Sequence, residues 1–128
     1  MLTVPVLGPT LAGCGGSGER GTGASAAATS FEQTVQKGDL RAACAVLAPD
    51  IRSELEESEK KACPVGTAAE KLPVGGPVST VNVYGRQARV VFKSDTLFLS
   101  RFPDGWKVVA AGCVPESGRP YRCAVKGG

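Results

Sequence analysis

The chain has 128 residues with no histidine, and 15 lysines and arginines against 12 acids give a net charge of +3. The lack of histidine removes the commonest general base and metal ligand, so Ser-His-Asp triads and His-metal sites are excluded. The positive charges are spread along the chain, which is typical of a solvated surface and argues against a nucleic-acid partner. One domain of about 100 residues with a thin stability margin is expected.

Residues 1–13 are apolar and uncharged, and they are too short to span a membrane, so we interpret them as a signal peptide. The segment Leu11-Ala12-Gly13-Cys14 resembles the lipobox of bacterial lipoproteins. That resemblance implies that Cys14 becomes the lipid-bearing first residue of the mature protein. No basic residue precedes the apolar run, and we therefore expect the natural start codon to lie upstream. The alternative is a chance Leu-Ala-Gly-Cys near a chain end.

Residues 14–28 are mostly Gly, Ser, Thr and Ala, which cannot bury enough apolar area to offset chain entropy. We expect a flexible tether with a reach on the order of 20 Å. It would connect Cys14, anchored on the extracytoplasmic face of the cell membrane, to one folded domain over residues 29–126.

Helical patterns fill the next part of the chain. A capping box predicts a helix start at Thr29 or Ser30, and Gly38 followed by Asp39 predicts a stop and a new N-cap. Apolar residues recur with helical spacing over residues 40–47, and Asp50 is expected to cap a further helix that closes at Cys63-Pro64.

Strand patterns follow, over residues 88–93, 96–102, 106–113 and 121–125, with a weaker strand around Val81 and Val83. Residues 114–120 are interpreted as a loop. Short connections require antiparallel neighbours. The sequence therefore predicts an α+β fold in which N-terminal helices pack on a curved antiparallel meander.

Apart from Cys14, four cysteines remain, and an even number in an exported domain indicates two disulfides. Three connectivities are open, and proximity in the chain favours Cys44 with Cys63 and Cys113 with Cys123. Zinc is the rival interpretation, but no C-x-x-C and no histidine is present. No metal and no cofactor is expected.

The segment Phe31–Leu47 with its Gly38-Asp39 break, together with Leu97-Phe98-Leu99 and Gly105-Trp106-Lys107-Val108, resembles the nuclear transport factor 2-like fold. More narrowly, Gly112-Cys113 and Pro120-Tyr121-Arg122-Cys123 are similar to small actinobacterial lipoproteins. The resemblance implies a curved sheet around a conical pocket. Five side chains are the candidate pocket residues: Tyr84, Phe92, Phe98, Arg101 and Trp106.

Catalysis is not expected, because the acidic residues fall at helix caps, helix surfaces and turns. Two functions are left. The first is a membrane-tethered interaction module that binds a protein partner or a second copy through an apolar patch on the sheet around Val91, Leu97 and Leu99. The alternative is a module that binds a small apolar ligand in an open cone.

Overall fold

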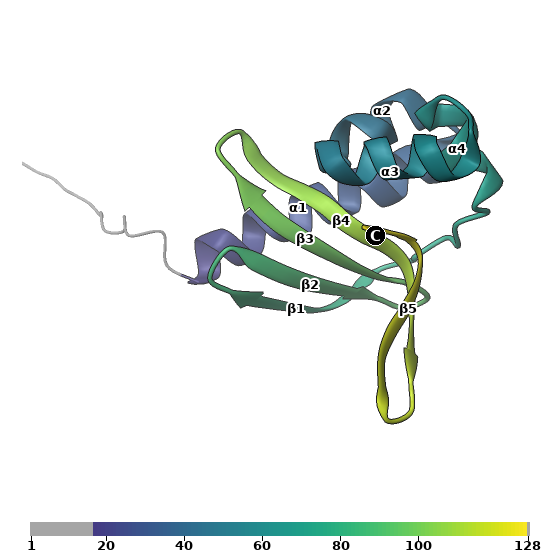
Figure 1. The fold of residues 1–128 in the computed structure, drawn as a ribbon. Helices are drawn as coiled ribbons and strands as arrows, with labels where there is room; N and C mark the ends of the chain where they lie inside the picture. Colours follow the sequence, from purple (N-terminus) through teal and green to yellow (C-terminus); the bar gives the residue numbers. More distant parts are fainter. Residues whose placement is uncertain (1–16, 128) are drawn as a thin grey trace, which may run out of the picture.

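The computed structural model describes residues 17–127, in which four helices precede a five-stranded sheet (Figure 1). The helices are α1 (Ser17–Lys37), α2 (Leu40–Val46), α3 (Pro49–Glu59) and α4 (Cys63–Ala69). The strands are β1 (Val78–Tyr84), β2 (Gln87–Phe92), β3 (Thr96–Phe102), β4 (Gly105–Glu116) and β5 (Arg119–Lys126). They form one antiparallel sheet in the order β1-β2-β3-β4-β5. The predicted α+β arrangement is confirmed.

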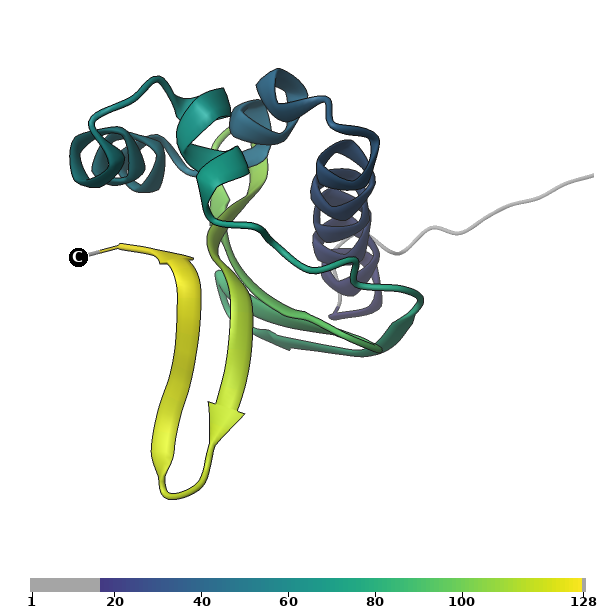
Figure 2. The same cartoon turned by 90° about the vertical axis from the view of Figure 1, so that its right-hand side faces the viewer.

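Helix α1 lies along one face of the sheet, while α2, α3 and α4 gather at one end of it (Figures 1 and 2). We call the face that packs on α1 the inner face and the opposite one the outer face. Ala88 of β2 pairs with Leu99 of β3, and Val90 pairs with Leu97, so these four side chains share the inner face. All four are at most 2% exposed, and with Phe31 they belong to one continuous apolar core.

The expected tether over residues 14–28 is wrong from Ser17 onward, because α1 begins there and not at Thr29 or Ser30. Ala24 and Ala28 are 0% exposed and lie one turn apart on the buried side of the helix. Glycines allow the helix to approach the sheet, since a Cβ at Gly23 would come within 3.0 Å of the Trp106 ring. The folded domain therefore starts no later than Ser17, about three residues after Cys14.

The junction between α1 and α2 forms as predicted. Gly38 adopts a left-handed φ of +78°, which ends α1, and the Asp39 side chain accepts a hydrogen bond from the Ala42 N–H. The next boundary differs from the prediction. Ala48 and not Asp50 is the N-cap of α3, since Pro49 occupies the first helical turn, where its missing N–H costs nothing.

The end of α3 also differs from the prediction. The helix ends at Glu59, where Lys60 takes a left-handed conformation, and Cys63-Pro64 starts α4 instead of closing α3. At the C-terminus, residues 114–120 are not a loop. Strands β4 and β5 continue to a tight turn at Gly118, whose φ is +67°, and this hairpin twists away from the rest of the sheet (Figures 1 and 2).

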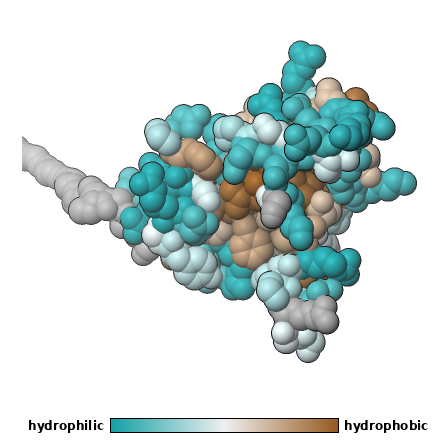
Figure 3. All heavy atoms as spheres, viewed as in Figure 1, coloured by the Kyte–Doolittle hydropathy of each residue, from teal (hydrophilic) through white to brown (hydrophobic). Residues whose placement is uncertain are grey.

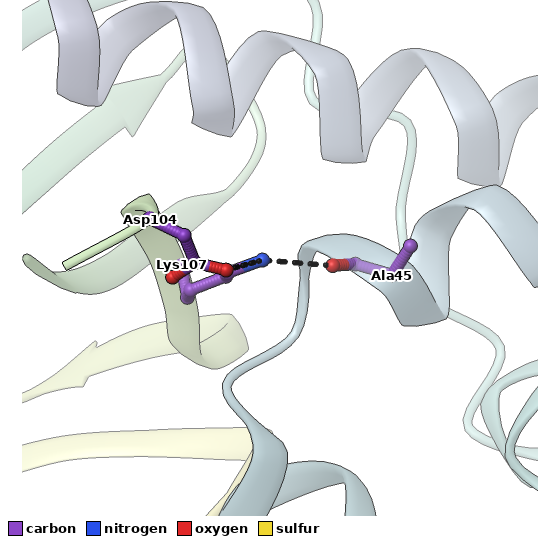
Figure 4. A network of polar contacts seen from close by, with 3 residues as sticks. All are labelled: Ala45, Asp104 and Lys107. Carbon is purple, nitrogen blue, oxygen red and sulfur yellow. Dashed lines mark hydrogen bonds and ion pairs between the residues drawn. The ribbon is translucent and has the colours of Figure 1, made fainter. Parts of the chain in front are cut away.

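The first half of β4 is held against the helical layer. The Ala48 N–H donates to the Val108 carbonyl at 2.9 Å, and Leu47 forms a bridge with Val108. The Lys107 Nζ reaches the Ala45 carbonyl and the Asp104 carboxylate, each at 3.4 Å (Figure 4). These contacts cover a strand edge that β5 leaves open, because β5 pairs only from Ala110 onward.

Both favoured disulfides are present. Cys44 of α2 is bonded to Cys63 of α4, and Cys113 of β4 is bonded to Cys123 of β5. By the loop-entropy relation, each contributes on the order of 3 kcal/mol. Stabilisation of this size matters in a domain with so small a core.

Candidate functional site

The five candidate pocket residues do not converge on one cavity. Phe92 and Trp106 face inward and are 4% and 8% exposed, so they belong to the core. Phe98 alternates with Leu97 and Leu99 and therefore lies on the outer face. Tyr84 is 57% exposed at the end of the edge strand β1, and Arg101 is exposed near the end of β3.

The interior that would have formed a conical pocket is filled by side chains. Phe31 from α1, Leu97 and Leu99 from β3 and Val108 from β4 are almost completely buried in the same core. The grooves found among the described residues lie at the surface and open to solvent. None of these grooves is an enclosed apolar cone of the kind that the alternative function would use.

The apolar patch expected around Val91, Leu97 and Leu99 is wrong for both leucines. Each is 0% exposed, because the pairing of β3 with Ala88 and Val90 turns them to the inner face. Val91 does lie on the outer face, where it is half-buried. Hydrophobic surface gathers over the middle of this side of the molecule and is framed by hydrophilic residues (Figure 3).

A polar and aromatic group of side chains occupies the outer face, and we call it the outer-face cluster: Asn82, Arg89, Phe98 and Tyr121. Arg89 Nη2 and Nε donate to Asn82 Oδ1 at 2.6 and 3.2 Å, and Nη1 donates to the Tyr121 hydroxyl at 3.3 Å. The Tyr121 and Phe98 rings meet edge to face, with centroids 5.0 Å apart.

The register of the sheet builds this cluster. Asn82 of β1 pairs with Arg89 of β2, which pairs with Phe98 of β3, so three neighbouring strands present these side chains in one row. Tyr121 comes from β5, which is not a neighbour of β2 or β3 in the sheet. The twist of the β4–β5 hairpin brings it there. Sequence alternation could have found Asn82 and Arg89, but it carried no signal for Tyr121.

A buried carboxyl pair lies at the opposite side of the sheet. Glu32 of α1 is 8% exposed and Asp95 of the turn before β3 is 6% exposed. Glu32 Oε1 accepts the Gly75 N–H at 3.0 Å, and Asp95 Oδ1 accepts the Thr96 N–H at 2.8 Å. Burial, with the adjoining Asp95 carboxyl as a second cause, raises the pKa of Glu32 to about 9.

Protonation of Glu32 completes this arrangement. Its Oε2 atom has no N–H or hydroxyl donor among residues 17–127, and two carboxyl groups hydrogen-bond only when one of them carries a proton. With a proton, Glu32 can donate to Asp95 while still accepting from Gly75. The sequence places Glu32 near a helix end, and the burial of its carboxyl follows only from the packing of α1.

The Glu32–Asp95 pair joins three segments: α1, the loop before β1 and the turn before β3. Gly75 leaves no space beside it, since a Cβ there would come within 2.7 Å of Glu32 Oε1. Both carboxyl groups are less than one tenth exposed, so little of the pair is accessible to a substrate. The pair is therefore a buried interaction between segments of the fold and not an exposed acid-base centre.

A second acidic pair lies on the helical layer. A hydrogen bond between the side chains of Glu70 and Glu59 is the main cause that raises the pKa of Glu70 to about 7, with a smaller contribution from burial. Both residues are at least partly accessible to solvent. Gly66 of α4 packs closely against α3, since a Cβ there would lie 3.4 Å from the Glu59 side chain.

Within the part of the chain that the structure describes, no group of three or more Cys, Asp or Glu residues is placed to hold a metal ion. None of the helices in that part is long and apolar enough to cross a membrane. Cys14, the expected lipidation site, and the expected signal peptide over residues 1–13 lie outside the described residues.

Comparison of the chain with models of protein families, with curated proteins and with solved structures gives no match.

Proposed function

We propose that this chain is an exported, non-catalytic interaction module held at the extracytoplasmic face of the cell membrane by lipid on Cys14. The lipobox-like Leu11-Ala12-Gly13-Cys14 supports the anchor. The two disulfides support a location in an oxidising compartment, because cytoplasmic thiols are kept reduced. We further propose a nuclear transport factor 2-like fold, which is supported by the helices that precede the antiparallel meander.

The module binds a protein partner or a second copy of itself through the outer face of its sheet. The observation that carries this part is the contrast between the two faces. Large apolar side chains fill the inner face, whereas the outer face offers the outer-face cluster beside half-buried Val91. Tyrosine, phenylalanine and arginine are the side chains that contribute most to protein interfaces.

A crosslinking experiment tests the docking face. A photoreactive amino acid at position 91 of the full chain, in its native host, should form a discrete crosslinked species. The same amino acid at position 33, an exposed site on α1 at the other side of the sheet, is the matched control. Equal crosslinking from both positions, or none from position 91, would contradict the proposal.

Native mass spectrometry of the full-length Cys14→Ser variant separates the two candidate functions. A dimer or a complex with the crosslinked partner supports the interaction module. A monomer that retains a small apolar molecule would support the ligand-binding alternative.

Intact-mass analysis of the wild-type chain from its native host tests the anchor separately. We expect cleavage before Cys14 and an added diacylglycerol, and we expect Cys14→Ser to leave the membrane fraction. An unmodified Cys14 would remove the anchor from the proposal without affecting the docking face.

A further inference from the structure

Three arginines meet at the end of the molecule where α1 begins, and we call this group the arginine end: Arg20, Arg86 and Arg101. Two adjacent surface grooves lie there, with volumes of about 530 and 360 Å³. Arg20 of α1 and Arg101 of β3 line both grooves, and Arg86 of the β1–β2 turn lines the smaller one. The Arg101 N–H donates to the Arg86 carbonyl at 2.8 Å, which holds these two residues side by side.

These three cations have no acidic partner within residues 17–127, and the ion pairs Lys107–Asp104 and Arg122–Glu116 involve other residues. Asp104, in the turn next to Arg101, is paired with Lys107 (Figure 4). Exposed Glu19 is the one carboxylate that lines the two grooves, so the residues around them carry an excess of positive charge. Like charges brought this close repel each other, and an anion bound between them would relieve the repulsion.

Two buried N–H donors at the same place also lack acceptors. Trp106, which is 8% exposed, and Gly23 form part of the wall of the larger groove. The indole Nε1 lies beside Gly23, at 3.1 Å from the place of a Cβ, and it has no hydrogen-bond partner among the described residues. The Arg20 Nε is buried and unpartnered in the same way. Buried donors without acceptors are rare in folded proteins and call for an explanation.

The N-terminus of α1 adds to the positive potential. Arg20 lies in the first turn of this 21-residue helix, where the helix dipole favours an anion. An ionised phosphate group offers acceptor oxygens, and arginine can bind it with two parallel hydrogen bonds.

From these observations we infer that the arginine end binds a phosphate group, with Arg20 and Arg101 as its principal contacts and the Trp106 ring in the wall of the larger groove. Arg86 contributes charge from the rim of the smaller groove.

The nearest source of phosphate is the headgroup layer of the membrane. Ser17 follows Cys14 by three residues, which reach at most roughly 10 Å, so a lipid on Cys14 would hold the arginine end close to the headgroups. This assignment of the source rests on the proposed lipid anchor. The phosphate site itself does not, because residues 17–127 alone form it.

The test uses the full-length chain with Cys14→Ser, so that binding does not depend on the lipid. Trp106 is the single tryptophan, and its fluorescence therefore reports directly on the site. We expect a saturable fluorescence change, weakened by salt, with vesicles that contain equal parts of phosphatidylglycerol and phosphatidylcholine. Vesicles of phosphatidylcholine alone should bind much more weakly. A parallel titration with inorganic phosphate distinguishes free phosphate from the membrane headgroup as the source.

The variant Arg20→Gln/Arg101→Gln should weaken vesicle binding about 25-fold, since each arginine near an anionic surface contributes about fivefold. The matched control is Lys37→Gln/Arg41→Gln, which removes the same charge from exposed residues at the other end of α1 and in the first turn of α2; Lys37 lies roughly 25 Å along the helix from Arg20. This control should change binding less than twofold, because the distance exceeds the Debye length. Thermal unfolding by circular dichroism verifies that both variants remain folded.

Binding to anionic vesicles without a response to inorganic phosphate supports the headgroup as the source, and a response to inorganic phosphate supports a free phosphate compound. Either result supports the site if Arg20→Gln/Arg101→Gln weakens the response and the control variant does not. Equal weakening by the two double variants, or no response of Trp106 in either titration, would overturn it. Failure of lipidation at Cys14 leaves these outcomes unchanged, so the two proposals can fail separately.

Discussion

Near its C-terminal end, α1 buries the Glu32 carboxyl against Asp95 and the Gly75 N–H, whereas near its N-terminal end it carries Arg20, which has no acidic partner in the described chain. Around the Glu32–Asp95 pair, polar groups bind each other within the fold. At the arginine end, two buried N–H donors have no acceptor. One helix therefore has polar groups that are paired within the fold near its C-terminal end and polar groups that lack a partner in the described chain near its N-terminal end.

The largest change in the free energy of unfolding should come from a side chain that enters the space beside Glu32. The change Gly75→Ala places a Cβ 2.7 Å from Glu32 Oε1 and 3.2 Å from the Phe92 Cβ, and we expect it to lower the free energy of unfolding by about 2 to 3 kcal/mol. Urea denaturation measures the loss. Gly18→Ala is the control, since its Cβ meets nothing within 4 Å and should stabilise the helix by up to about 1 kcal/mol. Equal changes in the free energy of unfolding for the two variants would mean that the surroundings of Glu32 are loosely packed.

Replacement of Glu32 by Gln tests whether the Glu32 carboxyl carries a proton in the folded state. The folded state holds this proton up to a pKa of about 9, whereas the unfolded chain releases it near 4.5, so stability from Glu32 is complete below pH 4.5 and declines as the pH rises toward 9. Glutamine can donate to Asp95 and accept from Gly75 without titrating. We expect Glu32→Gln to raise the free energy of unfolding at pH 8 by about 1 to 2 kcal/mol.

The measurement is urea denaturation of both proteins from pH 4 to pH 9. The two curves should meet near pH 4.5 and separate as the pH rises. Glu57→Gln, at an exposed position of α3, serves as the control and should follow the wild type. A constant difference between Glu32→Gln and the wild type over this range would show that Glu32 does not retain its proton.

At the arginine end, Gly23→Ala should disturb the indole of Trp106. The added Cβ would lie 3.0 Å from Cδ1 and 3.1 Å from Nε1, so either the ring or the helix has to shift. The gain in helix propensity partly offsets the clash, and we expect a net loss of about 1 kcal/mol. A shift in tryptophan emission should accompany it. An unchanged spectrum would place the indole farther from α1 than the structure does.

The smallest change in the free energy of unfolding should come from Arg86→Gln. This exposed guanidinium makes no ion pair within residues 17–127 and lies near two other cations, so its removal relieves repulsion. We expect a gain of a few tenths of a kcal/mol at low salt, about 0.3 kcal/mol, that disappears at high salt. Arg41→Gln, which lies beyond the opposite end of α1, should show no such salt dependence. Thermal unfolding at two salt concentrations measures both.

Features that depend on neighbouring residues were predictable from the sequence. The left-handed Gly38, the N-cap at Asp39 and the strand around Ala88 each follow from local backbone and capping preferences. The pairing of Cys44 with Cys63 and of Cys113 with Cys123 also followed from proximity in the chain.

The inward direction of β3 was not predictable in the same way. Leu97, Phe98 and Leu99 are all apolar, so alternation does not tell which of them faces the core. Pairing of β3 with Ala88 and Val90 decides it, burying both leucines and leaving Phe98 to meet Tyr121 on the outer face. The outer-face cluster therefore depends on contacts between residues that are far apart in the sequence.

The start of α1 was missed for a related reason. Residues 17–28 have the small and glycine-rich composition of a linker, and helix propensity alone does not favour a helix there. Packing of α1 against Val81 and Trp106 stabilises the helix where helix propensity does not, and the glycines at 21 and 23 lie at these contacts.

By itself, the sequence determined that helices precede strands, because turn, capping and alternation preferences act over a few residues. Proximity in the chain favoured the observed disulfide partners among three possible connectivities. Only the tertiary structure decided which polar groups are enclosed and which remain open. Glu32 meets Asp95 from 63 residues away, and Arg20 lies beside Arg101 at the other end of the same helix. Burial and charge at these places come from packing between distant segments, which no local pattern encodes.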